Sequence, residues 1–200
     1  MIKAVCFDLD GVYFTPEGKK SFETSLIDLS NNKEKALHVL YQSTEMLDYI
    51  KGIITEEVFW DYVREYLSIN LTNEELTHLW VKDYQINIEV KTYIEKIKRK
   101  GYISCTCSNN NPARVRGLQN MFHFLEDFDV SIFSYETGTV KPSIEIFKTL
   151  VEKAGVKPSE LVYSDDNPER LHGAKELGIT AFIYKDFTQF TAELEKLGVR

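Results

Sequence analysis

The sequence predicts an α/β protein: a Rossmann-like, doubly wound parallel sheet that carries a small all-helical cap. Three features of the 200 residues predict this fold. A short apolar run opens the chain, a long segment of helical periodicity follows it, and apolar runs then alternate with helical segments. The composition supports a folded core, since 43% of the residues are hydrophobic and 28% are charged, which excludes disordered, collagen-like and coiled-coil chains.

The first part of the chain predicts one strand and then the cap. Residues 2–9 form an apolar run that ends in acids and is typical of a buried strand. Between residues 15 and 86 apolar residues recur at helical spacing, and Thr55 and Thr72, each followed by glutamates, are typical helix N-termini. This pattern predicts three or four helices and no strand. We therefore expect a core domain of residues 1–14 and 87–200 and a cap domain of residues 15–86.

From residue 88 onward the pattern predicts strands that alternate with helices. The first helix is expected over 90–100, where Gly101 stops it. An alternation of this kind is typical of a parallel sheet with helices on both faces. The further strands are predicted at 102–107, 129–134, 161–164 and 180–184, and the further helices at 143–153, 168–177 and 188–197.

Charge and cysteine content limit the possible partners. Lysine and arginine number 24 against 31 aspartates and glutamates, which gives a net charge of −7 and argues against binding to nucleic acid or to an anionic membrane. Three cysteines, which form no C-x-x-C, indicate neither a disulfide framework nor a zinc site. No apolar stretch reaches membrane length and the first residues do not resemble a signal peptide, so we expect a cytoplasmic protein.

Polar side chains follow the predicted strands at their carboxyl ends. Ligands of open parallel sheets bind at this edge, so we expect these side chains to meet there. Crowded carboxylates need a cation, and an all-oxygen set suits Mg²⁺ shared with a phosphate. A lysine can neutralise phosphoryl charge, a serine can donate to it, and a carboxylate can act as the nucleophile. The residues are Asp8, Asp10, Ser108, Asn109, Lys141, Asp165 and Asp166.

Each of these motifs alone also fits an ordinary structure. The segment Asp8–Gly11 resembles the start of a calcium loop, but its glycine is at the fourth position instead of the sixth, and Lys19 stands where that loop needs a glutamate. The asparagines and proline after Ser108 are typical of a helix cap, and so is the Asp-Asp-Asn-Pro segment at Asp165. Only their occurrence together at successive strand ends favours a catalytic site.

Taken together, four segments resemble the four motifs of the haloacid dehalogenase-like (HAD) hydrolase superfamily, in order and over nearly the whole chain. Residues 52–60 resemble part of the helical cap in the subfamily whose cap follows the first motif. That subfamily includes sugar-phosphate phosphatases and the phosphatase domain of soluble epoxide hydrolases. The four segments are Phe7–Val12, Ser108–Asn109, Lys141–Phe147 and Ser164–Asn167.

The resemblance implies a role for each matched residue. Asp8 would be the nucleophile, and Asp10 would be the general acid and then the general base. Ser108 would hydrogen-bond the phosphoryl oxygens and Lys141 would neutralise their charge, with Asn109 beside them in binding the substrate. Positioning and charge stabilisation of this kind are what phosphoryl transfer needs. The Mg²⁺ ligands would be Asp8, the backbone carbonyl of Asp10, Asp166 and, through water, Asp165.

Two further positions bear on the chemistry. Metal-free haloacid dehalogenases of this fold lack an acid at the position of Asp10, so Asp10 favours phosphate chemistry. Arg170 stands where relatives often have an asparagine or an aspartate. It could pair with Asp165 or Glu169 or could point to solvent, and it puts the metal affinity in question.

The sequence says less about substrate recognition. Tyr13, which we predict to bind substrate, and Phe14 follow the first motif and could equally pack at a hinge. Cap residues 49–52 are further candidates. Arg114 and Arg116 follow Ser108, but solvated helix positions are the more ordinary interpretation of both.

These observations predict a Mg²⁺-dependent phosphatase that hydrolyses a small soluble phosphomonoester, such as a sugar phosphate, through an aspartyl-phosphate. Its partner would be that small metabolite, and the chain would be a monomer or a homodimer. Three alternatives stay open: a phosphomutase of the same fold, a metal-free haloacid dehalogenase, and a binding protein without catalysis.

Overall fold

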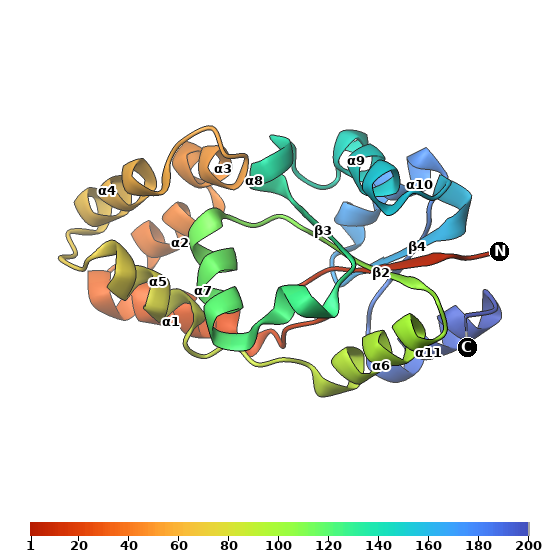
Figure 1. Ribbon diagram of the computed structural model, residues 1–200. Coiled ribbons are helices and arrows are strands. Elements are labelled where there is room, and N and C mark those ends of the chain that lie inside the picture. Colours follow the sequence, from red (N-terminus) through yellow and green to blue (C-terminus); the bar gives the residue numbers. More distant parts are fainter. Residues whose placement is uncertain (200) are drawn as a thin grey trace.

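The computed structural model describes residues 1–199 and contains a five-stranded parallel sheet with the strand order β3-β2-β1-β4-β5 (Figure 1). The central strand β1 pairs with β2 on one side and with β4 on the other. The winding reverses between β1 and β4, which is where open α/β sheets place their ligands. The strands are β1 (Ala4–Phe7), β2 (Ile103–Ser108), β3 (Val130–Phe133), β4 (Leu161–Asp165) and β5 (Thr180–Ile183).

Helices cover both faces of this sheet. The side chains of β1 alternate: Val5 and Phe7 belong to the apolar cluster that includes residues of α6 and α11, and Ala4 and Cys6 belong to the cluster that includes residues of α9 and α10. The doubly wound α/β fold predicted from the sequence is therefore confirmed. The four helices are α6 (Ile88–Arg99), α9 (Ile144–Ala154), α10 (His172–Leu177) and α11 (Phe187–Lys196).

The segment between β1 and α6 is helical, as predicted, but it contains five helices where three or four were expected. The additional helix arises because α2 and α3 are short and separate, and the Ser43 hydroxyl caps α3 by accepting from the Met46 N–H. Thr55 and Thr72 do begin helices, and Thr72 forms a capping box with Glu75. The five are α1 (Glu17–Ser30), α2 (Lys33–Tyr41), α3 (Thr44–Ile50), α4 (Glu56–Leu67) and α5 (Asn73–Val81).

Two linkers that lie side by side join this helical segment to the sheet. The N–H of Thr15 donates to the Gln85 carbonyl at 2.9 Å, and the N–H of Asn87 donates to the Tyr13 carbonyl at 2.8 Å. The apolar cluster on this side of the sheet continues through the linkers into the helical segment. We keep the division into a core of residues 1–14 and 87–200 and a cap of residues 15–86 as a proposal.

The remaining differences lie around the strand ends. The sequence indicated only the start of α7 (Pro112–Phe122), where Asn111 is the cap, and it did not predict the four-residue α8 (Ser134–Thr137). The predicted helix 168–177 is a 3₁₀ turn, Pro168–Leu171, followed by α10. Other 3₁₀ turns occur at Phe124–Asp127 and Pro158–Glu160. Among residues 1–199, no helix combines the length and the apolar composition that a membrane crossing requires.

Candidate active site

Asp8 follows β1 and its side chain is buried at the carboxyl end of the sheet. Its Oδ1 accepts a hydrogen bond from Lys141 Nζ at 2.8 Å, and its Oδ2 lies 3.4 Å from the Arg170 guanidinium. Burial raises the pKa of the Asp8 carboxyl to about 6, although the charges of Lys141 and Arg170 act in the opposite direction. The carboxylate form of Asp8 therefore depends on the cations that surround it.

Lys141 stands at the centre of the site and is 3% exposed. Besides Asp8, its ammonium donates to Asp165 Oδ2 at 2.6 Å, to the Tyr163 hydroxyl at 2.8 Å and to the Cys107 carbonyl at 2.9 Å. Burial alone would lower the pKa of Lys141, but the adjacent carboxylates of Asp8 and Asp165 outweigh burial and raise it. The lysine is thus a fixed positive charge between two acids.

Asn109 and Ser108 lie where β2 ends. The Asn109 amide holds the main chain of Lys141 at two points: Oδ1 accepts from the Lys141 N–H at 2.8 Å and Nδ2 donates to the Lys141 carbonyl at 3.1 Å. Asn109 also lines the pocket described below, so its amide positions the lysine at the edge of the space for substrate. Ser108 is the last residue of β2 and is buried beside β1.

Three carboxylates form a cluster that fits a divalent cation. Oxygens of Asp8, Asp165 and Asp166 lie within 4.8 Å of one another. Both oxygens of Asp165 already accept hydrogen bonds, Oδ2 from the lysine and the tyrosine and Oδ1 from the Asn167 N–H at 2.9 Å. Asp165 is therefore suited to support a cation through water, whereas Asp8 and Asp166 can offer oxygens directly. An all-carboxylate set with room for water matches Mg²⁺.

Gly11 allows the first motif to approach Asp166 closely. Its φ of +77° lies in the left-handed region, and a Cβ at this position would stand 2.4 Å from Asp166 Oδ2. Burial, and secondarily the charge of Asp165, raises the pKa of Asp166 above its usual range. A bound cation would offset this cost, because it favours the ionised carboxylates.

Asp10 turns away from this cluster toward α7. Its Oδ2 lies 2.9 Å from Arg114 Nη2, and its other oxygen, Oδ1, is buried and has no hydrogen-bond partner among the described residues. The Arg114 side chain is 7% exposed. The guanidinium also donates from Nε to Asn110 Oδ1 at 2.7 Å and from Nη1 to the Tyr84 hydroxyl at 3.2 Å. The predicted acid–base residue is thus paired with a buried cation.

A pocket of about 160 Å³ opens above Asp10 and Arg114. Its floor is polar and comes from the strand ends and α7, and Arg170 closes one side. Its roof is largely apolar and comes from α1, α2, α3 and α5, with Lys19 and Tyr41 as the polar exceptions. The roof residues are Lys19, Phe22, Leu40, Tyr41, Met46, Ile50 and Trp80.

The helical segment is closed over this pocket by contacts to α7 and α8. Ser134 Oγ donates to the Ile50 carbonyl at 2.6 Å, and the Tyr49 hydroxyl accepts from the Ala113 N–H at 3.2 Å. At Gly52 the main chain passes so near Tyr135 that a Cβ would stand 2.3 Å from its carbonyl oxygen. Of the candidate substrate contacts at residues 49–52, Ile50 lines the pocket, whereas Tyr49 and Gly52 hold the segment in place.

Tyr13 does not reach the pocket, and our prediction that it binds substrate is wrong. The side chain is 0% exposed and its hydroxyl donates to Asp127, which ends the 3₁₀ turn Phe124–Asp127. Phe14 is equally buried, and its ring packs against the rings of Tyr84 and Phe124. The two aromatic residues pack at the linker, which is the alternative that the sequence left open.

Two residues belong to the site although the sequence did not predict them there. Arg114 was interpreted as a solvated helix residue, yet it is buried beneath Trp80 and Tyr84, whose rings face its guanidinium at 5.8 and 5.9 Å. Its position four residues before the buried Leu118 was the available signal, because the two share one helix face. Tyr163 was predicted only as part of the apolar strand 161–164, yet its hydroxyl accepts from Lys141 and donates to Asp165. Arg116, in contrast, is exposed and pairs with Glu56.

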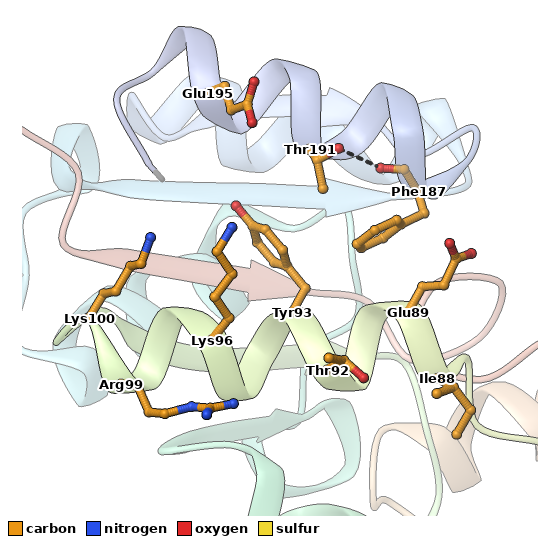
Figure 2. Close-up of a pocket in the computed structure, with 10 residues that line it drawn as sticks. All are labelled: Ile88, Glu89, Thr92, Tyr93, Lys96, Arg99, Lys100, Phe187, Thr191 and Glu195. Atoms are coloured by element: carbon orange, nitrogen blue, oxygen red, sulfur yellow. Dashed lines mark hydrogen bonds between the residues drawn. The ribbon is translucent and has the colours of Figure 1, made fainter.

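A second hollow lies apart from this site. It has a volume of about 890 Å³ and runs between α6 and α11, where Tyr93 and Phe187 face each other (Figure 2). Lys96 of α6 and Lys100, which follows α6, project toward α11, and Glu195 lies on α11 (Figure 2). It shares no residue with the carboxylate cluster or with the pocket above Asp10.

Comparison with curated proteins gives relatives over the whole chain. A D-ribitol-5-phosphate phosphatase from Bacteroides thetaiotaomicron is 26% identical over 201 residues, which cover 97% of each chain. Bifunctional epoxide hydrolase 2 from the rat is 30% identical over 105 residues, or 50% of this chain and 19% of that protein. The mouse protein of the same name is 26% identical and aligns with 98% of this chain but 39% of its own length. The chain thus spans well under half of the epoxide hydrolases.

Comparison with solved structures points to the same group. The crystal structure of a HAD family enzyme from Bacteroides thetaiotaomicron, in complex with magnesium and inorganic phosphate, has a TM-score of 0.79 and 28% identity, and covers 95% of this chain and 99% of that chain. An L-2-haloacid dehalogenase from Xanthobacter autotrophicus has a TM-score of 0.66 at 18% identity, covering 100% and 85% of the two chains, and shares the fold alone.

The residues that carry the predicted motifs meet at one edge of the sheet, beneath a helical segment that follows the first motif. A model of the haloacid dehalogenase-like hydrolase family matches residues 2–178. The resemblance identified in the sequence is therefore confirmed, and this chain belongs to the haloacid dehalogenase-like hydrolases.

Proposed function

We propose that this chain is a Mg²⁺-dependent phosphatase that hydrolyses a small phosphomonoester through an aspartyl-phosphate on Asp8. The observation that carries the proposal is the position of Asp8. Its carboxylate is buried between Lys141 and Arg170, and it shares a cluster with Asp165 and Asp166. A buried nucleophile with fixed cations beside it is what the transfer of a charged phosphoryl group needs.

In the first step, an Asp8 oxygen attacks phosphorus and the bond from phosphorus to the leaving oxygen breaks. Asp10 gives its proton to that oxygen, so the leaving group departs as an alcohol. Lys141 and Ser108 stabilise the charge on the phosphoryl oxygens. A bound Mg²⁺, with Asp8, the main-chain carbonyl of Asp10, Asp166 and, through water, Asp165 as ligands, would neutralise part of the same charge.

In the second step, water attacks the phosphorus of the aspartyl-phosphate. Asp10, now ionised, takes a proton from this water, and the bond between phosphorus and the Asp8 oxygen breaks to release phosphate. The unpartnered Oδ1 of Asp10 is the oxygen available for both proton transfers. The helical segment over the pocket supports the exclusion of bulk water during the reaction.

The size of the pocket supports a small substrate. Its 160 Å³ lies below the usual range for ligand pockets, which supports a small leaving group. The D-ribitol-5-phosphate phosphatase among the relatives supports a sugar phosphate or a similar ester. A phosphorylated side chain of a folded protein would not pass the closed helical segment. Cytoplasmic localisation and a monomeric or dimeric state stay predictions.

The test is phosphate release from p-nitrophenyl phosphate by the purified chain, with Mg²⁺ and with EDTA, alongside Asp8→Asn. We expect turnover that needs Mg²⁺ and disappears in Asp8→Asn, because the amide is not a nucleophile. Equal turnover by both proteins would contradict the role of Asp8. Turnover in EDTA would contradict the role of the metal.

A phosphomutase is distinguished by the fate of the phosphoryl group. Incubation in water enriched in oxygen-18 labels the released phosphate if water attacks the aspartyl-phosphate. We expect one labelled oxygen in each phosphate. Phosphoryl transfer to a second hydroxyl of the substrate, with no labelled phosphate, would favour the phosphomutase.

A further inference from the structure

Arg170 stands beside the carboxylate cluster on a turn that the main chain holds in place. It lies in the 3₁₀ turn Pro168–Leu171 that follows β4, and its N–H donates to the Asn167 carbonyl at 3.1 Å. Asn167 in turn donates from its own N–H to Asp165 Oδ1 at 2.9 Å, which ties the turn to the cluster. The Arg170 guanidinium lies 3.4 Å from Asp8 Oδ2 and 4.0 Å from Asp165 Oδ1.

Two cations divide the carboxylate oxygens of Asp8 and Asp165 between them. The Lys141 ammonium donates to Asp8 Oδ1 and to Asp165 Oδ2. Arg170 faces the opposite oxygen of each acid, Asp8 Oδ2 and Asp165 Oδ1. Lys141 makes two further hydrogen bonds and is buried, so its position is fixed. The oxygen of Asp8 that remains for a divalent cation is therefore the one that Arg170 contacts.

Arg170 and a divalent cation compete for this oxygen. Positive charges repel each other, and the repulsion is strong where burial keeps water out. The side chains of Asp8 and Asp165 are 1% and 0% exposed, so solvent screens little of it. A guanidinium that stays on Asp8 therefore weakens the binding of a divalent cation to the same carboxylate.

Of the two cations, Arg170 is the one that is able to move. Its side chain is 27% exposed, and its hydrogen bond to Asp8 is long, at 3.4 Å. The hydrogen bonds of Lys141, in contrast, measure 2.6 to 2.9 Å. Arg170 also lines the pocket above Asp10. Rotation of its long side chain therefore carries the guanidinium from the cluster into the pocket, at the loss of a weak hydrogen bond.

We propose that Arg170 occupies the free oxygens of Asp8 and Asp165 in the metal-free protein and leaves them for the pocket when Mg²⁺ binds. The arginine then lowers the affinity for Mg²⁺, because its contact with Asp8 is lost on binding. In the pocket, the guanidinium is a positive charge that an anion can balance, so the binding of Mg²⁺ and the binding of an anion favour each other. This inference rests on the metal site of the proposed function and concerns the residue that competes for it.

The first test is the affinity for Mg²⁺, measured by calorimetric titration of the wild type and of Arg170→Gln at one pH. We expect Arg170→Gln to bind Mg²⁺ about tenfold more tightly, because a competing charge is removed. A gain in affinity separates competition from a structural role, since a loss of structure would weaken binding. Arg116→Gln is the matched control: this arginine is exposed, pairs with Glu56 and should leave the affinity unchanged. Equal or weaker binding by Arg170→Gln would overturn the proposal.

The second test uses inorganic phosphate as the anion. The attraction between Mg²⁺ and phosphate contributes alike in both proteins, so the difference between them measures the part of the arginine. Saturating phosphate should raise the affinity for Mg²⁺ about fivefold more in the wild type than in Arg170→Gln. An equal increase in both proteins would overturn the movement of the guanidinium into the pocket.

Crystal structures of the wild type, grown with EDTA and with MgCl₂, show the movement without the use of a variant. We expect the Arg170 guanidinium to contact Asp8 in EDTA and to lie in the pocket when Mg²⁺ is bound. A guanidinium that stays on Asp8 in the presence of bound Mg²⁺ would overturn the proposal.

Phosphate release separates this inference from the proposed function. Turnover of p-nitrophenyl phosphate by the wild type tests the function, and the Mg²⁺ affinities test the role of Arg170. Mg²⁺-dependent turnover with equal affinities of the wild type and Arg170→Gln overturns the inference and leaves the phosphatase function standing. Tighter binding of Mg²⁺ by Arg170→Gln without turnover of any ester supports the inference and contradicts the phosphatase function.

Discussion

The two sides of the active site differ in how completely the protein satisfies its own charges. On the nucleophile side, defined here as Asp8, Lys141, Tyr163 and Asp165, the ammonium contacts both acids and the tyrosine, and no side chain is more than 3% exposed. On the leaving-group side, defined as Asp10, Asn110 and Arg114, one carboxylate oxygen and one amide nitrogen have no partner among the described residues.

This difference corresponds to the two parts of a phosphate ester, the phosphoryl group that all substrates share and the leaving group that varies between them. The phosphoryl group is the same in every ester, and the nucleophile side is arranged before substrate arrives, which lowers the reorganisation needed during reaction. The leaving group varies, and the unfilled hydrogen bonds lie where it would bind. Substitutions on the nucleophile side should therefore affect all substrates alike, and those on the other side should change the order of preference.

The largest effect is expected for Lys141→Met. Removal of the ammonium leaves two buried carboxylates side by side, so kcat/KM should fall about 10²–10³-fold for every ester. The free energy of unfolding at neutral pH should fall by about 3–5 kcal/mol, as for other broken buried ion pairs. Steady-state kinetics on two esters and denaturant unfolding measure both quantities.

The matched control is Lys148→Met, which removes an exposed lysine on α9 that pairs with Glu145. It should change stability by less than about 1 kcal/mol and leave the kinetics unaltered. The comparison of the two sides breaks down if Lys141→Met slows one ester far more than another, because the lysine would then take part in substrate selection.

The nucleophile side could be predicted from the sequence because its residues lie next to strands. A parallel sheet brings all its carboxyl ends to one edge, so the position of Asp8, Ser108 and Asp165 along the chain is enough to place them together. Lys141 is farther from its strand, but it lies in the loop after β3 and could therefore be placed at the same edge. The placement of these residues is therefore a property of topology more than of detailed packing.

The leaving-group side could not be predicted in the same way because it depends on contacts between distant segments. Arg114 is buried only because Trp80 and Tyr84 cover it, and nothing local to α7 specifies them. Tyr13, in contrast, was predicted to bind substrate but lies outside the pocket. It lies beside the first motif in the sequence, but the turn after Asp10 directs its ring into the core, toward Phe124 and Phe128.

A smaller effect on metal binding is expected for Gly11→Ala. The added Cβ would stand 2.4 Å from Asp166 Oδ2, so that carboxylate must move, and the affinity for Mg²⁺ should fall about 10- to 100-fold. Gly101→Ala is the control, because Gly101 has a similar φ of +86° but no atom within 4 Å of the added Cβ. Calorimetric titration with Mg²⁺ compares them. An equal loss in both variants would attribute the effect to backbone strain.

Tyr163→Phe sharpens the comparison within the nucleophile side. The hydroxyl donates to Asp165 Oδ2 and accepts from Lys141, so its loss should reduce kcat about tenfold for every ester and leave KM nearly unchanged. Stability should fall by about 1.5–3 kcal/mol, since hydrogen bonds to charged groups are lost. Tyr102→Phe removes a hydroxyl that contacts the Gly198 carbonyl far from the site and should alter neither constant. A rise in KM for one ester alone would contradict this positioning role.

The smallest effect is the pH dependence that burial gives to the nucleophile. In the metal-free protein the pKa of Asp8 is raised to about 6, above its value of 3.8 when exposed. The folded state thus holds a proton between about pH 4 and 6 that the unfolded chain has released. This contribution to stability is complete below pH 4 and is lost as the pH rises through 6.

Because Mg²⁺ competes with that proton, the apparent affinity for Mg²⁺ should fall about five- to tenfold between pH 7 and pH 5. Titration of the wild type and of Asp8→Asn at the two pH values measures it, since the variant has no carboxyl to protonate at this position. A wild-type affinity that does not change with pH would show that the cations around Asp8 hold it ionised without help from the metal. The nucleophile side would then be fully balanced by protein groups alone, and the contrast with the leaving-group side would be greater than the contacts by themselves indicate.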